Sequence, residues 1–272
     1  MRRFIANSLL FWTLVFAIGA ISADGQQSLT AAEIVNKHLS AVGGRQPLAG
    51  FKSRVAIGTV KKENDPEFRM AIVSEAPNRV SAIYVFENYD WHLTYDGNKA
   101  MVSGIRFPRE LSPLQDKYQD MLTSGLMFNS ISLYNILIDS ESYGAKLEAK
   151  GTKKMKGRPT YVVEVKRAKA APARLYFDAE SFMWIRTEYG SASVSKPTGQ
   201  FTNAVVPHGE DEWSVDFYFD TSDFREVDGV KLPFKFEQVI TYPVLRQKKS
   251  GIISGTISEY QHNVPIDPKM FQ

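Results

Sequence analysis

The order of hydrophobic and polar positions separates a short helical segment from a long part with strand periodicity. Within residues 30–42 the apolar residues recur every three or four positions, which is the spacing of one helix face. Thr30 and Glu33 have the spacing of a capping box at the start, and Gly43 and Gly44 follow the end. The pattern predicts an amphipathic helix that lies on an apolar surface.

From residue 51 onward the pattern alternates with a period of two, which is typical of half-buried strands. Short links such as Asp96-Gly97-Asn98 join the segments, and short links connect antiparallel neighbours because parallel strands need crossovers of about a dozen residues. The predicted strands lie near residues 51–60, 68–75, 79–87, 90–95, 99–103, 145–150, 159–167, 173–178, 182–189, 213–220, 232–241 and 252–260.

Two stretches interrupt the strand pattern. Residues 109–143 hold apolar residues at helical spacing and predict two short helices with a hinge at Gly125. These helices would be either ordinary core or a lid over a cavity. Residues 191–212 have few strand formers and predict a long irregular loop. Neither stretch reads as a linker, so we expect a single domain over residues 24–272.

The predicted fold class is mainly β, of the α+β kind, with one large curved antiparallel sheet. We expect an open half-barrel with helices in its concavity, and a closed barrel is the competing architecture. The apolar character of residues 109–143 favours the open form, because such helices would have no apolar surface to cover outside a closed barrel.

Residues 1–23 have the zones of a secretory signal peptide in their usual order. Two arginines precede an apolar run over residues 9–21, which is shorter than the ~20 residues that a membrane-spanning helix needs. Small residues follow, and they predict cleavage after Ser22 or Ala23. An uncleaved membrane anchor is the alternative. We therefore expect an exported protein of the periplasm.

The composition is that of a folded protein, with 43% hydrophobic and 23% charged residues and a formal net charge of +3. The chain has no cysteine, which excludes disulfides, thiol nucleophiles and an N-terminal lipid-modified cysteine. Export without disulfides favours a bacterial envelope protein. The low net charge predicts no nucleic-acid partner, because nucleic-acid binding depends on neutralising phosphates. We expect a monomer.

The chain offers little catalytic chemistry. Its four histidines lack the spacing of metal-binding motifs, and there is no G-x-S-x-G elbow, P-loop or G-x-G-x-x-G. His38 in the predicted helix is expected to pack or to face solvent rather than to catalyse. We therefore predict no catalytic residue, no metal site, no cofactor and no enzymatic activity.

The apolar strand faces and the apolar insertion favour a site for a hydrophobic ligand. At about 0.8 kcal/mol per buried methylene, a long acyl chain would gain several kcal/mol without polar contacts. The inward face of residues 79–87 can be assigned either way, because both faces are apolar. The expected ligand-binding residues are Arg79, Ile83, Val85, Trp91, Leu93, Leu122, Leu126, Met127, Phe128, Val163, Val165, Phe217 and Phe219.

Several short motifs follow one another along residues 29–271. They are Pro77-Asn78-Arg79, Tyr95-Asp96-Gly97-Asn98-Lys99, Leu175-Tyr176-Phe177-Asp178, Trp184-Ile185-Arg186, residues 224–233 and residues 263–267 with Phe271. In this order they resemble the LolA-type outer-membrane lipoprotein carriers and their wider superfamily. The resemblance implies a half-barrel with helices in its concavity, and a periplasmic protein that shields a lipid or the acyl chain of a lipoprotein.

The chain departs from this family at Ala76, where the carriers have an arginine that is tied to lid closure and ligand release. The departure favours a LolA-like binder of hydrophobic ligands over the lipoprotein carrier itself. Arg79 is either a contact for a ligand head group or a partner in a salt bridge, and Trp91 is either a ligand platform or core. Two other functions stay open: an envelope sensor that binds inner- or outer-membrane proteins, and a hydrolase.

Overall fold

The computed structural model describes residues 29–63, 65–87, 90–103, 112–113, 122, 126–133, 135–167, 170–195, 212–244 and 247–272. The predicted signal peptide lies outside these residues. Within the described ranges, no helix is both long enough and apolar enough to cross a membrane.

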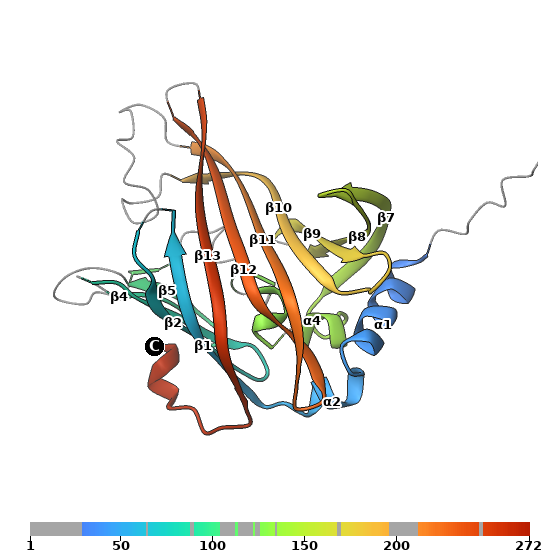
Figure 1. The fold of residues 1–272 in the computed structure, drawn as a ribbon, viewed down its shortest axis with the longest axis horizontal. Coiled ribbons are helices and arrows are strands. Elements are labelled where there is room, and N and C mark those ends of the chain that lie inside the picture. The colour runs from blue at the N-terminus through green and yellow to red at the C-terminus, as the bar shows by residue number, and fades with distance from the viewer. Residues whose placement is uncertain are drawn as a thin grey trace, which may run out of the picture.

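One 13-stranded antiparallel sheet carries the fold (Figure 1). The strands are β1 (Ser53–Lys62), β2 (Phe68–Glu75), β3 (Arg79–Val85), β4 (Asp90–Tyr95), β5 (Ala100–Ser103), β6 (Ser112–Pro113), β7 (Ala145–Met155), β8 (Arg158–Arg167), β9 (Ala170–Asp178), β10 (Trp184–Ser195), β11 (Glu212–Val227), β12 (Val230–Val244) and β13 (Gln247–His262). Their order in space is β6-β5-β4-β3-β2-β1-β13-β12-β11-β10-β9-β8-β7. The sheet is open, because β6 and β7 stand at opposite ends of this order, and the predicted fold class is confirmed.

The sheet order determines where the insertion must run. Strands β1 to β6 lead from the middle of the sheet to one edge, and β7 to β13 lead from the other edge back to the middle. The chain between β6 and β7 therefore has to cross from edge to edge. In a curved sheet the short route is across the concave side, and α4 (Asn135–Ile138) lies there behind the long strands in Figure 1.

The strand predictions hold for nearly every element, and β2 and β4 match them residue for residue. The last three strands run for 16, 15 and 16 residues, longer than predicted. Asp228 and Gly229, with φ of +49° and +79°, form the tight turn that lets β11 and β12 pair up to their ends. The predicted 191–212 loop is wrong at both ends, because β10 continues to Ser195 and β11 begins at Glu212, while residues 196–211 lie outside the described part.

Helix α1 (Ala31–Ala41) is confirmed together with its cap. The backbone N of Thr30 donates to Glu33 Oε2 at 2.8 Å, and the backbone N of Glu33 donates to Thr30 Oγ1 at 3.2 Å. The helix packs against β7 and β8, and the short helix α2 (Arg45–Gly50) follows it. Gly43 has a φ of +121°, and a Cβ there would lie 2.3 Å from the carbonyl oxygen of Gly229. A glycine is therefore required where the end of α1 meets the β11–β12 turn.

The first of the two predicted helices lies mostly outside the described residues, and the second half of the insertion is less helical than its spacing predicts. Among its described residues, Ser112–Pro113 pairs with β5 as a strand, Leu122 is α-helical, and residues 127 and 128 form a turn, followed by a 3₁₀ turn, η1 (Asn129–Ile131), and the single turn α4. Gly125, the predicted hinge, lies outside the described residues. From residue 126 onward the helical spacing was misleading, because a segment buried on all sides is apolar whatever its backbone does.

Candidate functional site

Residues 126–133, which we call the plug, lie on the concave side of the sheet. Each of residues 126–132 exposes 3% or less of its surface. A lid that lies over a cavity would keep one face in solvent, whereas the plug is buried on every side. It contacts β10 and β12 through η1. Its backbone is irregular, so its polar groups need hydrogen-bond partners outside the segment.

Asn129 ties the plug to one half of the sheet. Its Nδ2 donates to the carbonyl oxygen of Phe219 at 3.1 Å and to Thr221 Oγ1 at 3.3 Å, and Thr187 donates its hydroxyl proton to Asn129 Oδ1. The backbone of Asn129 has a φ of +48°, a left-handed conformation that asparagine tolerates better than most residues. Its side chain thus joins the plug to β10 and β11.

Arg54 ties the plug to the other half of the sheet. It extends from β1 toward the concave side and exposes only 1% of its surface. Its Nη1 donates to the carbonyl oxygens of Ser130 and Ser132, each at 2.9 Å. Next to it, Ser74 Oγ on β2 accepts from the backbone N of Leu133 at 3.1 Å. A buried guanidinium therefore binds the plug through two backbone carbonyls.

The apolar side chains of the plug pack into a single hydrophobic core. Phe128 meets Phe219 edge to face, with 6.0 Å between the ring centroids. Leu126, Met127 and Ile131 belong to the same cluster. The plug is thus anchored by polar groups and surrounded by apolar ones.

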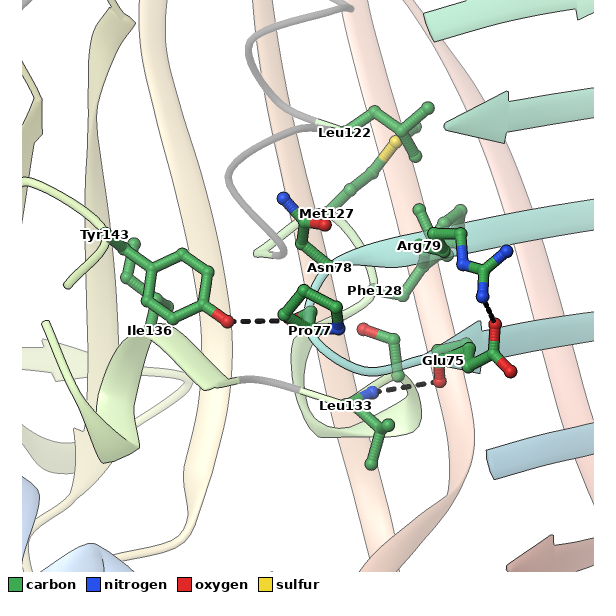
Figure 2. A pocket seen from close by; sticks show the side chains of 13 residues that line it. Glu75, Pro77, Asn78, Arg79, Leu122, Met127, Phe128, Leu133, Ile136 and Tyr143 are labelled. Carbon is green, nitrogen blue, oxygen red and sulfur yellow. Dashed lines mark hydrogen bonds and ion pairs between the residues drawn. The ribbon is translucent and has the colours of Figure 1, made fainter. Parts of the chain in front are cut away.

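The free space beside the plug is small. The cavity lies between the plug, Leu122, α4 and the β2–β3 turn, and it holds about 20 Å³, the room of about one water molecule (Figure 2). Tyr143 donates its hydroxyl proton to the carbonyl oxygen of Pro77 at 2.7 Å across this space. Among the described residues this cavity has no room for an acyl chain, so a ligand at this place would have to displace the plug.

Most of the predicted ligand-binding residues meet in this core. Residues from both halves of the sheet and from the insertion belong to one cluster: Trp91, Leu93, Leu122, Leu126, Met127, Phe128, Val163, Val165, Phe217 and Phe219. Whether they bind a ligand stays a prediction.

Ile83 and Val85 lie on the other face of β3, half-buried, whereas Ala82 and Tyr84 are buried on the concave face. The prediction that Ile83 and Val85 face the concave side is therefore wrong, and the alternative assignment of this strand is correct. The hydrophobic pattern was ambiguous because the outer face is itself covered near β3 and β4, where η2 (Pro268–Phe271) packs.

Arg79 lines the mouth of the cavity but is bound to protein groups. It forms an ion pair with Glu75 on β2 (Figure 2). Its guanidinium lies 5.1 Å from the centre of the Phe271 ring. Its motif neighbour Asn78 faces Gly97, where a Cβ would lie 3.1 Å from Asn78 Oδ1. The turn at residues 77–79 and the turn at residues 95–99 therefore pack against each other. This packing explains why these residue types are needed there without a bound ligand.

Sequence reasoning missed Arg54, Asn129 and Ser74. A signal was available for Arg54, since it occupies the inward phase of a strand whose other inward positions are small or apolar. An arginine in that phase predicts a buried guanidinium that needs acceptors. For Asn129 and Ser74 we see no signal, because both residue types are common in turns and strand ends.

The buried histidine of α1 has a structural position. His38 Nδ1 lies 2.9 Å from the carbonyl oxygen of Phe182, and burial lowers the pKa of His38 to about 4. In the part of the chain that the structure describes, no group of three or more His, Asp or Glu side chains is arranged to hold a metal ion.

The sequence matches no protein-family model and no curated protein. Among solved structures, the chain is similar to a proposed outer membrane lipoprotein-sorting protein domain from Vibrio parahaemolyticus, with a TM-score of 0.49 and 10% identity over 88% of this chain and 95% of that one. It is similar to a LolA superfamily protein from Nitrosomonas europaea, with a TM-score of 0.49 and 12% identity over 90% and 98% of the two chains. A DUF1329 family protein from Desulfovibrio piger gives a TM-score of 0.49 and 8% identity over 88% and 95%. One of the three carries the name of the superfamily that the sequence motifs resemble.

Proposed function

We propose that this protein is a periplasmic carrier or chaperone that takes up a lipid or the acyl chain of a lipoprotein by exchanging it for the plug. The observation that carries the proposal is the combination of an apolar concave wall with a buried occupant that polar groups hold in place. The proposal assigns no catalytic residue and no cofactor.

The free energies of the two occupants are of similar size. Leu126, Met127, Phe128 and Ile131 are each 2% exposed or less, and burying each such side chain is worth ~1.5–3 kcal/mol, or roughly 6–12 kcal/mol together. A chain of ~14 methylenes gains ~11 kcal/mol when it is buried in their place. Exchange is therefore close to balanced, which is what reversible uptake and release require.

The polar anchors also have a use after exchange. Once Ser130 and Ser132 leave, the Arg54 guanidinium needs new acceptors, because a buried charge without them is strongly unfavourable. Ester carbonyls or a phosphate of a lipid head group supply such oxygens. The ligand we propose therefore carries oxygen acceptors at one end of a long apolar chain.

Native mass spectrometry of the mature protein tests the proposal directly. Protein purified from the periplasm, or stripped by organic extraction and then mixed with a phospholipid such as palmitoyl-oleoyl phosphatidylethanolamine, is expected to carry one acyl ligand. A protein that never holds and never accepts an acylated molecule would overturn the proposal.

Two matched variants separate a displaceable plug from ordinary core. Phe128→Ala removes a ring from the plug, and Phe177→Ala removes one from β9 beneath α1; the two side chains are 1% and 0% exposed. Both changes should lower the free energy of unfolding by ~3–5 kcal/mol. Only Phe128→Ala should raise the affinity for the lipid, by tenfold or more, because it weakens the competing occupant. Equal affinities in the two variants would contradict the exchange.

A groove on another part of the sheet favours a second candidate function, a sensor or regulatory domain that binds an envelope protein. It encloses about 670 Å³ and combines charged residues such as Lys156, Asp220 and Glu237 with apolar ones such as Met183 and Phe224. Lipid-free protein that forms a stoichiometric complex with an inner- or outer-membrane protein, and loses it on Glu237→Lys, would support this function.

A further inference from the structure

Arg54 is held in place by two residues outside the plug. Its Nε donates to His262 Nε2 at 2.9 Å, and His262 Nδ1 lies 2.7 Å from Asp228 Oδ2. A carboxylate only accepts hydrogen bonds, so Nδ1 carries the imidazole proton and Nε2 presents the lone pair that Arg54 needs. Asp228 thereby selects the tautomer of His262 that can bind Arg54.

The three residues join the surface of the molecule to its interior. Asp228 lies in the β11–β12 turn with 61% of its side chain exposed, whereas the His262 side chain is 3% exposed. His262 and Arg54 are paired in the register of β13 and β1. Phe51 stacks on the imidazole with 3.9 Å between the ring centroids, which fixes the plane of the ring.

We propose that His262 and Asp228 are positioning residues that keep Arg54 on the plug, and that a proton on His262 releases it. Protonation places an N–H on Nε2 as well, so the acceptor for Arg54 Nε is lost and two cations face each other at a hydrogen-bond distance. The carbonyl anchors at Ser130 and Ser132 then lose their fixed donor. This role of His262 and Asp228 rests on the proposed carrier function only for its biological purpose, which would be ligand exchange that depends on pH.

The charges around His262 give the direction of the effect. The charged groups that face its ring are Arg54 from β1 and Asp228 from the β11–β12 turn; burial and Arg54 lower the pKa of His262, Asp228 raises it, and the net shift is downward. When the plug opens and frees the His262 ring, the pKa of His262 returns toward its ordinary value of about 6.5. The open form therefore binds protons more readily, so the closed form loses stability as the pH falls below about 6.5.

A single cysteine in the plug reports opening in the absence of any lipid. The chain has no cysteine, and the Ser130 hydroxyl has no hydrogen-bond partner among the described residues, so Ser130→Cys is a mild change that adds the only thiol. The rate of thiol modification is measured from pH 7.5 to pH 5.5 and divided by the rate of an exposed Ser254→Cys variant at the same pH. This ratio removes the ordinary pH dependence of thiolate chemistry.

The labelling rate of Ser130→Cys relative to Ser254→Cys is expected to rise about three- to tenfold from pH 7.5 to pH 5.5. Adding His262→Gln should keep it low and flat, because the amide oxygen accepts from Arg54 at every pH. Adding His92→Gln, the same change at a histidine on β4, should leave the rise intact. His38 stays neutral throughout, with a pKa lowered to about 4. A rise that survives in His262→Gln, or one that His92→Gln abolishes, would overturn the proposal.

Asp228 provides a second test that does not depend on the folding of a His262 variant. Asp228→Ala removes the group that selects the tautomer and should raise the ratio at pH 7.5 by threefold or more, whereas Asp228→Asn keeps an oxygen acceptor and should not. Equal ratios in these two variants would overturn the positioning role. No lipid enters these measurements, so their failure is distinct from a failure to bind an acyl ligand.

Discussion

Helix α1 and the plug both cover apolar parts of the same sheet, yet they are held in different ways. The helix satisfies its backbone polar groups internally and meets the sheet through apolar side chains such as Ile34 and Leu39. The plug has an irregular backbone. It is held by hydrogen bonds to Arg54 and Ser74 of the sheet and by those of its own Asn129 side chain. We therefore propose that the regular cover belongs to the permanent core and that the anchors of the irregular one are exchanged.

The difference also concerns what happens when each cover leaves. Lifting α1 would expose Phe177 and Trp184 to water with nothing to replace the helix. Lifting the plug would expose a comparable apolar wall. It would also expose the Arg54 guanidinium and the hydroxyls of Thr187 and Thr221, which can bind oxygen-rich ligands. Under the proposed function, the plug is the part of the interior whose loss a lipid compensates.

The largest expected effect comes from Arg54. Arg54→Met keeps an apolar side chain of similar length but leaves the carbonyl oxygens of Ser130 and Ser132 without their donor. A buried acceptor that loses its donor costs ~1–3 kcal/mol, so the two carbonyl oxygens together destabilise the protein by roughly 2–6 kcal/mol. We expect a loss of that size in the free energy of unfolding in urea, together with at least a hundredfold faster labelling of Ser130→Cys.

The control for this change is an exposed arginine with a carboxylate partner. Arg225 binds Asp223 at 2.7 Å on the surface, and such pairs contribute ~1 kcal/mol or less. Arg225→Met should leave the labelling of Ser130→Cys unchanged. If Arg54→Met behaved like Arg225→Met, the plug would be held by packing alone and its difference from α1 would disappear.

Asn129 tests the anchor on the opposite half of the sheet. Asn129→Gly keeps the left-handed backbone available but removes the hydrogen bonds to Phe219, Thr221 and Thr187. The lost hydrogen bonds correspond to ~1–3 kcal/mol, so plug labelling should rise roughly 5- to 100-fold. Thr187→Val removes one of these bonds from the sheet side.

The two changes form a double-mutant cycle. Because Thr187 and Asn129 share a hydrogen bond, the combined effect of Asn129→Gly and Thr187→Val should be smaller than the sum of the single effects. Strict additivity, measured by the same labelling assay, would show that the Thr187 hydroxyl does not hold the plug.

The sheet was largely predictable because its determinants are local. Side-chain alternation marks each strand, and pairs such as Asp228-Gly229 mark the turns, so neither depends on distant residues. The inward face of β3 could not be predicted, because Ile83 and Tyr84 are both apolar and the choice depends on what covers each side.

The anchors of the plug were not predictable for a different reason. Arg54 binds carbonyl oxygens 76 and 78 positions away in the chain. Every residue carries a carbonyl, so this acceptor leaves no trace in the side-chain sequence. The hydrophobic pattern predicted the apolar wall and the insertion that covers it, and the sheet order adds the reason, because the chain between β6 and β7 has to cross the concavity.

The smallest expected effect concerns the cap of α1 and tests whether the two covers are independent. Thr30→Ala removes the hydroxyl that accepts from the Glu33 backbone N, which should lower the free energy of unfolding by ~1 kcal/mol. Because α1 packs mainly against β7 and β8, whereas the plug is anchored by side chains of β1, β2, β10 and β11, the labelling of Ser130→Cys should stay within twofold of its original rate. Urea unfolding and thiol labelling of the same protein measure the two effects side by side. A rise in plug labelling that matches the loss of global stability would mean that both covers open together, and the distinction between a permanent and an exchangeable cover would fail.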